Sequence, residues 1–143
     1  MPSGAILMET VWICSAAMAR TASTMLALGT PLPAFRLARV NGDKVKGVQV
    51  KAGTFASTDF EQKPILLMVL CAHCPFVKHI EPEITRLEND FASRVQFVGL
   101  SSNSLITHPQ DGPAQLAEQA QRHGWTFPYL LDDQQVLAKS LQA

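Results

Sequence analysis

Hydrophobic residues form two nearly unbroken runs in the middle of the chain, Ile65–Leu70 and Val95–Leu100. Runs of this length without alternation are typical of parallel strands that are covered on both faces. Between them, apolar residues recur every three or four positions, at Phe76, Ile80, Ile84, Leu87 and Phe91. This spacing predicts a helix whose apolar stripe packs in the core, with Glu81, Glu83, Glu88 and Asp90 on or near the solvated side. The order strand, helix, strand predicts a right-handed βαβ unit.

The C-terminal third continues this alternation of helix and strand. A second helix is predicted between Asp111, as its N-cap, and Gly124, as its stop. Phe127–Leu131 is predicted to be a third strand, and Asp132 or Asp133 then caps a further helix. These elements extend the βαβ unit into a single α/β domain.

The region before the first apolar run has a different pattern. Phe35–Val40 and Val45–Val50 are β-prone and flank Asn41-Gly42, a dipeptide that tolerates the positive φ of a hairpin turn. Lys51–Lys63 is mainly polar and is predicted to be a connector with a short turn. The expected fold is therefore an α/β domain with a mainly parallel central sheet flanked by helices and an N-terminal β-hairpin.

Composition and charge exclude several classes of protein. The chain has 143 residues, 47% of them hydrophobic and 17% charged, which suits one globular domain. Twelve basic residues balance twelve acidic ones, so there is no net positive charge to favour nucleic acid. No apolar run approaches the roughly 18 residues of a membrane helix. We therefore expect neither nucleic acid nor membrane as a partner.

Residues 1–24 do not fit the domain pattern. Two apolar runs occur, Ile6–Met8 and Val11–Ala19, but no Lys or Arg precedes them and Glu9 lies between them, which disfavours a secretory signal. We interpret residues 1–24 as a disordered or mis-started extension, residues 25–143 as the domain, and the location as cytoplasmic. Cys14 lies in the extension and is assigned no role.

The candidate chemistry lies where the first buried run ends. Cys71 and Cys74 are three residues apart at the junction of a strand and a helix, a spacing that brings both sulfurs to one side of the first turn. The unpaired N–H groups and dipole of a helix N-terminus stabilise a thiolate, so we expect a lowered thiol pKa. Cys71, which we expect to be more exposed, is the candidate nucleophile and Cys74 the candidate resolving thiol. His73 can add positive charge or a hydrogen bond to the thiolate, which favours the reduced form and makes the couple more oxidising.

The segment Leu70–Ile80, with the sequence LCAHCPFVKHI, closely resembles the redox motif of thioredoxin-like redoxins in the peroxiredoxin-related, AhpC/TSA-type branch. Weaker likenesses occur at residues 28–35, 101–103, 111–113 and 127–130, so the resemblance covers about residues 26–141. It implies a thioredoxin-like fold and thiol–disulfide exchange without a bound cofactor. The implied partners are a disulfide-containing protein or small-molecule thiol as substrate, and a reducing partner protein.

The chain departs from that family in ways that bear on function. Family members continue into a Thr-Pro segment, a strand pair and a final helix, which this chain lacks after Ala143, so residues 25–143 are expected to be incomplete at the C-terminus. One missing strand would pair beside Ile65–Leu70, and its absence would leave an apolar edge exposed. Peroxiredoxins carry a threonine three residues before the nucleophile, where this chain has Met68. We therefore expect dithiol exchange rather than peroxidase activity. An antioxidant role is still compatible with dithiol exchange.

Two alternative functions remain. The first is a thioredoxin-like module that binds a soft metal, zinc or copper, through Cys71, Cys74 and a histidine. Zinc prefers four ligands, and no second CxxC or HxxxH pair is present, so we expect no metal. The second is an inactive, truncated redoxin. Other residues are expected to have structural roles only. His108 is expected to be solvated, and His123 to interact with a helix dipole. Trp125 is expected to lie in the core.

Overall fold

The computed structural model describes residues 26–143 except 46, 47, 51, 52 and 61. It contains the predicted βαβ unit, made of β5 (Ile65–Val69), α1 (Pro75–Phe91) and β6 (Gln96–Ser101). Strands β5 and β6 pair in parallel, from Ile65 opposite Gln96 to Val69 opposite Leu100. The extension at residues 1–24 lies outside the described residues.

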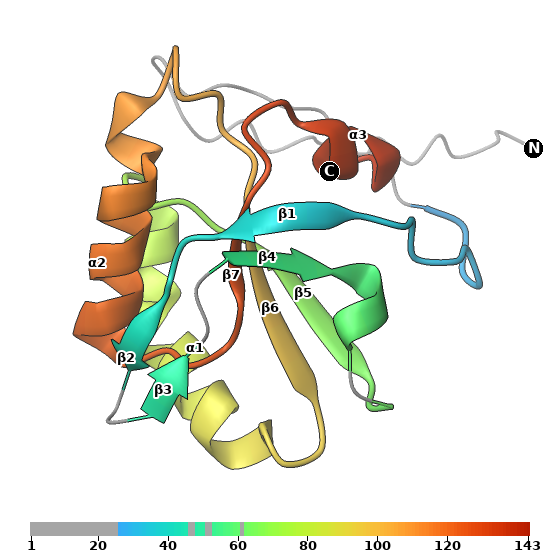
Figure 1. The fold of residues 1–143 in the computed structure, drawn as a ribbon, viewed down its shortest axis with the longest axis horizontal. Coiled ribbons are helices and arrows are strands. Elements are labelled where there is room, and N and C mark those ends of the chain that lie inside the picture. The colour runs from blue at the N-terminus through green and yellow to red at the C-terminus, as the bar shows by residue number, and fades with distance from the viewer. Residues whose placement is uncertain (1–25, 46–47, 51–52, 61) are drawn as a thin grey trace, which may run out of the picture.

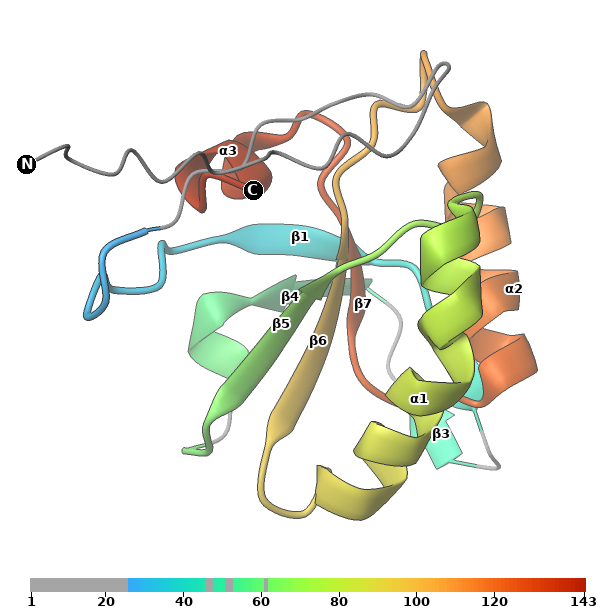
Figure 2. The same cartoon turned by 180° about the vertical axis from the view of Figure 1, so that it is seen from behind.

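The remaining elements place three parallel strands beside an antiparallel N-terminal pair. They are β1 (Arg36–Arg39), β2 (Asp43–Val45), β3 (Val48–Val50), β4 (Gly53–Ala56), the 3₁₀ turns η1 (Ser57–Asp59) and η2 (Pro109–Asp111), α2 (Pro113–His123), β7 (Tyr129–Leu131) and α3 (Val136–Ser140). The main sheet has the order β4-β1-β7-β6-β5 (Figures 1 and 2). Strand β1 is antiparallel to both β4 and β7, whereas β6 is parallel to both β5 and β7. The sheet therefore confirms the expected α/β class.

Two apolar clusters hold the helices to opposite faces of the sheet. Ile84 of α1 and Leu116 of α2 pack with Trp125 on one face, and Leu137 of α3 packs with Leu100 on the other. Figure 2 shows α1 and α2 side by side along the sheet, with α3 separate from them. Because β6 lies between covering elements on both faces, its residues from Phe97 onward are buried, as predicted.

The N-terminal hairpin is present, but its partner and its turn differ from the prediction. Strand β1 pairs with β4, which lies in the stretch predicted to be a connector, and a small β2–β3 hairpin intervenes. Asn41 is buried instead of lying at a turn tip. Its Nδ2 donates to the Phe127 carbonyl over 2.7 Å, and its Oδ1 accepts from the Tyr129 N–H over 2.9 Å. The asparagine side chain thus extends the sheet pairing where a local pattern predicted a turn.

The predicted apolar stripe of α1 is mostly exposed, so its assignment to the core is wrong. Its members Phe76, Ile80, Leu87 and Phe91 keep between 38% and 64% of their surface exposed. Only Ile84 of that stripe is buried.

The face of α1 that packs inward instead includes two glutamates predicted to be solvated. Glu81 and Glu88 are 5% and 4% exposed. Glu88 Oε1 accepts hydrogen bonds from the Thr126 N–H and hydroxyl and from the Phe127 N–H. These donors come from a distant segment and offset part of the cost of burying the carboxylate, whose Oε2 has no hydrogen-bond partner among the described residues.

Strand β5 lies at one edge of the sheet and none of its residues is fully buried, which corrects the prediction that it is covered on both faces. Ile65, Leu66 and Val69 are 38%, 39% and 48% exposed. The described sheet therefore has a partly exposed apolar strand at this edge.

The starts of α2 and α3 test the predicted capping roles of two aspartates, Asp111 and Asp132. Gly124 adopts a left-handed φ of 64° and ends α2, as predicted. The N-cap of α2 is Gly112, not Asp111, which closes η2. The N-cap of α3 is Gln135, not Asp132 or Asp133, although the Asp132 carboxylate accepts from the N–H groups of Val136 and Ala138 in the first turn of α3. No helix in the described part of the chain is long and apolar enough to cross a membrane.

Candidate active site

Cys71 and Cys74 lie on the short loop that joins β5 to α1. Cys74 is the N-cap of α1 and Pro75 occupies its first position, where a missing N–H costs nothing, as the sequence predicted. Both thiols are free and both are half-buried, so Cys71 is not distinctly the more exposed one. The two cysteines are thus brought to the end of a fixed strand and the start of a fixed helix.

The pKa of Cys71 is raised, not lowered as expected from the helix N-terminus. Burial raises it from an ordinary value of 9.0 to about 11, against a lowering contribution from the backbone hydrogen bond with Cys74. The charges of Asp111 and Cys74 contribute to the same increase. Cys71 precedes the N-cap by three residues, and at this position desolvation outweighs that hydrogen bond.

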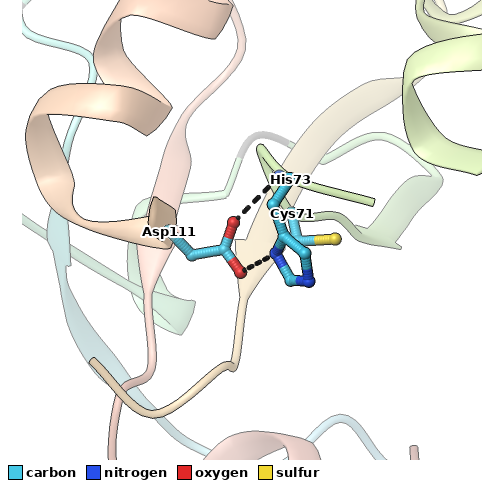
Figure 3. Close-up of side chains that lie close together, drawn as sticks. All are labelled: Cys71, His73 and Asp111. Atoms are coloured by element: carbon cyan, nitrogen blue, oxygen red, sulfur yellow. Dashed lines mark hydrogen bonds and ion pairs between the residues drawn. The ribbon is translucent and has the colours of Figure 1, made fainter. Parts of the chain in front are cut away.

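A buried carboxylate holds the loop between the two cysteines. Asp111 is fully buried, and its Oδ1 accepts from the N–H groups of Ala72 and His73 over 2.8 and 3.1 Å. Its Oδ2 lies 2.7 Å from His73 Nδ1 and accepts from Asn103 Nδ2 over 2.6 Å. Figure 3 shows Asp111 facing the His73 imidazole. Sequence reasoning missed this role because Asp111 also fits the pattern of a helix N-cap.

The His73 ring is fixed on two sides. Asp111 binds its Nδ1, and the ring of His108 stacks against it with centroids 5.2 Å apart. His108 is therefore half-buried against His73, not freely solvated as predicted. Cys71 lies behind the His73 ring in Figure 3. The imidazole is placed to act electrostatically or as a proton donor and acceptor near the thiol.

Cys71, His73 and Asp111 each offer one donor atom within 4.8 Å of the other two. Such a group has the residue types of a metal site. Both Asp111 oxygens, however, already interact with the four donor atoms described above. The arrangement therefore suits an aspartate that orients a histidine better than a third metal ligand.

A network of hydrogen-bonded polar side chains in the interior reaches the loop that carries the cysteines. Gln119 Nε2 donates to the Cys71 carbonyl over 3.2 Å and to Glu81 Oε1 over 2.7 Å. The Tyr129 hydroxyl donates to Gln119 Oε1 over 2.9 Å. Glu81 Oε2 lies 2.6 Å from His123 Nε2, so His123 has a carboxylate partner that the sequence did not predict. Burial, and then the negative charges of Cys71, Asp111 and Glu81, raise the pKa of Tyr129, which keeps its hydroxyl a donor.

The structure brings together three of the predicted site residues, Cys71, His73 and Cys74. Asp111 and Gln119 complete the surroundings of the loop, and neither carried a sequence signal for that role.

Comparisons with known proteins agree with this fold. A model of the AhpC/TSA family matches residues 28–143. An uncharacterized conserved protein from Geobacillus kaustophilus is 34% identical, with a TM-score of 0.73 over 85% of this chain and 60% of its own. A hypothetical protein from Sinorhizobium meliloti 1021 is 26% identical, with a TM-score of 0.72 over 85% of this chain and 62% of its own.

A more distant structure has the same fold. It is a secreted Mycobacterium tuberculosis disulfide oxidoreductase homologous to E. coli DsbE, 16% identical, with a TM-score of 0.55 over 73% of this chain and 65% of its own. This chain thus spans about 60% of the length of the first two structures. A search of curated proteins found no match. The architecture is the thioredoxin-like fold, with a mixed five-stranded sheet and flanking helices.

Proposed function

We propose that this chain, which belongs to the AhpC/TSA family, is a thiol–disulfide oxidoreductase whose redox couple is Cys71 and Cys74. The observation that carries the proposal is the placement of two free thiols three residues apart at the strand-to-helix junction, with the loop between them fixed by Asp111. Its substrate would be a disulfide, and its electrons would come from a protein or small-molecule thiol.

The proposed reaction has two exchange steps. The Cys71 thiolate attacks one sulfur of the substrate disulfide, which forms a mixed disulfide and releases the other half as a thiolate. Cys74 then attacks Cys71 Sγ, so that the intramolecular disulfide forms and the second half leaves. Two electrons pass to the substrate, and the two cysteine protons end on the released thiols. A dithiol reductant reverses these steps on the enzyme.

His73 is proposed to tune this couple. Its ring lies beside Cys71 and its Nδ1 is engaged by Asp111, so positive charge on the ring would stabilise the thiolate. Stabilising the reduced form makes the couple more oxidising. Peroxide reduction is disfavoured because Met68 stands where peroxiredoxins carry a hydroxyl.

Trapping of the mixed disulfide tests the assignment of the two thiols. In a Cys14→Ser background, Cys74→Ser should accumulate a covalent adduct with a disulfide substrate on Cys71, visible by intact mass and removed by reductant. The matched variant Cys71→Ser should form no such adduct under the same conditions. An equal yield from both variants would contradict the assignment of Cys71 as nucleophile.

A redox titration of the same Cys14→Ser protein tests whether the pair acts as a unit. In glutathione buffers, with alkylated thiols counted by mass, the two thiols should titrate together as a two-electron couple between about −270 and −120 mV. Independent titration of the two thiols would favour the inactive redoxin. Stoichiometric zinc or copper that survives purification and is lost in Cys71→Ser would favour the soft-metal module.

A further inference from the structure

A polar groove opens beside the loop that carries the cysteines. It encloses about 230 Å³ and is lined by Ala72 and His73 of the loop, Lys78 of α1, and Gln115, Glu118 and Arg122 of α2. Two backbone hydrogen bonds to Asp111 fix the loop side of this groove. The cysteines do not line the groove, but His73 does, and a ring nitrogen of His73 lies within 4.8 Å of Cys71 Sγ.

The charges along the groove are not neutralised internally. Lys78, Glu118 and Arg122 are exposed, and none of them forms an ion pair with another residue that the structure describes. The two cations exceed the single anion, so the groove favours a ligand with net negative charge.

The spacing of these charges fits a short peptide. Gln115, Glu118 and Arg122 follow one face of α2 over about 10 Å, which equals about three residues of extended chain. Glu118 and Arg122 are one helical turn apart, about 6 Å between their Cβ atoms, so together they can bind the ammonium and carboxylate of one α-amino acid. Lys78 lies in the first turn of α1 and can bind a second carboxylate.

We infer that this groove binds the carboxylate-bearing arm of a small peptidic disulfide and holds its sulfur–sulfur bond against Cys71. The inference rests on the proposed function, because it names the substrate class of the same site. The chemistry is the exchange described above, with the released halves leaving as thiols.

A comparison of two disulfides of different charge tests the groove. Glutathione disulfide carries carboxylates and ammonium groups, whereas hydroxyethyl disulfide is uncharged. The fully reduced protein is mixed with each in a single turnover, and its thiols are counted by alkylation and mass. The measured quantity is the rate with glutathione disulfide divided by the rate with hydroxyethyl disulfide.

Removal of the two cations should lower this ratio. Each exposed ion pair contributes about a threefold preference, so Lys78→Gln with Arg122→Gln should lower the ratio about tenfold. The control Lys139→Gln removes an exposed cation of α3 outside the groove and should leave the ratio unchanged. Added salt should lower the ratio in the unaltered protein and have less effect in the double variant. An unchanged ratio in the double variant would overturn the inference.

A binding measurement separates this inference from the proposed function. S-methylglutathione has the same charged groups as glutathione but no free thiol. It should shift the backbone amide resonances at positions 78 and 122 in the unaltered protein, and shift them less in the double variant. If these shifts occur but neither disulfide is reduced, the groove inference is supported and the proposed redox function fails. If no shift occurs and both disulfides are reduced at equal rates by all variants, the groove inference fails and the redox function holds.

Discussion

At the scale of single residues, the Cys71 thiol is defined by its partial burial. Its pKa is raised to about 11, mainly by desolvation, and the Asp111 charge contributes to this increase. At neutral pH the thiolate is then a minor species, since each pH unit below the pKa reduces it about tenfold. The reactivity of Cys71 should therefore depend steeply on pH.

We expect alkylation of Cys71 to accelerate about tenfold for each pH unit from pH 8 to pH 10 and to level off near pH 11. The measurement is the rate of iodoacetamide labelling of the reduced Cys14→Ser protein, with the labelled position located by tandem mass spectrometry. The urea-unfolded protein is the control, and its labelling should level off near pH 9. A plateau below pH 9 in the folded protein would contradict the raised pKa.

The same raised pKa has a consequence for folding stability. The folded state binds the Cys71 proton more tightly than the unfolded state, in which the thiol has its ordinary pKa of 9.0. Between about pH 9 and pH 11 only the unfolded state loses this proton, so the contribution of Cys71 to stability is lost as pH rises through this window. Cys71→Ser should lack that part of the decline, as urea denaturation at pH 8 and pH 10.5 would reveal.

Asp111→Asn should increase the reactivity of Cys71 and destabilise the protein. Removal of the negative charge lowers the Cys71 pKa, and labelling at pH 9 should rise by a factor of up to about ten, or one pKa unit. The asparagine cannot satisfy all four donor atoms, which should cost about 1–3 kcal/mol of unfolding free energy. The exposed Asp133→Asn is the control for both measurements. Slower labelling in Asp111→Asn would show that the carboxylate acts on Cys71 mainly through His73.

The contrast between Cys74 and Asp111 shows what local sequence can specify. Cys71, His73 and Cys74 are neighbours, and the proline after them fixes the helix start, so their placement followed from spacing alone. Asp111 reaches the same loop from nearly forty residues away. Before the fold is known, its pattern is that of an N-cap, and Gly112 takes that place in the structure.

At the scale of elements, α1 shows why a correct helix can be assigned the wrong buried face. The period of its apolar residues predicted the helix between the right residues. Which side faces the sheet depends on partners elsewhere: Glu88 receives donors from Thr126 and Phe127, and Glu81 from Gln119. Strand β4 was missed for a similar reason, because its pairing with β1 is non-local.

Substitution of two isoleucines on α1, one buried and one exposed, tests which face of the helix packs in the core. Ile84→Ala removes a side chain that is 4% exposed and should cost about 2–5 kcal/mol of unfolding free energy. Ile80→Ala changes a side chain that is 45% exposed, one turn earlier on the same helix, and should cost about 1 kcal/mol or less. Urea denaturation followed by circular dichroism gives both values. Equal losses would place Ile80 in the core, as the sequence pattern predicted.

At the scale of the whole molecule, the order of the strands has consequences for association. The parallel βαβ unit was predictable because its two runs are adjacent in the chain and connected by a helix. The insertion of β7 between β1 and β6 was not, since it depends on β1 meeting β7 near the end of the described chain. This order leaves β5 at one edge, with half-exposed Ile65, Leu66 and Val69.

An apolar strand edge can pair with another strand, so the 143-residue chain should self-associate as its concentration rises. Leu66→Lys places a charge on that edge and should shift the population toward monomer in sedimentation velocity experiments. Leu28→Lys is the control, because Leu28 is fully exposed and lies outside the sheet. If both variants associate like the unaltered chain, β5 is not the contact. If Leu28→Lys alone restores the monomer, association depends on the segment before β1 and not on the sheet edge.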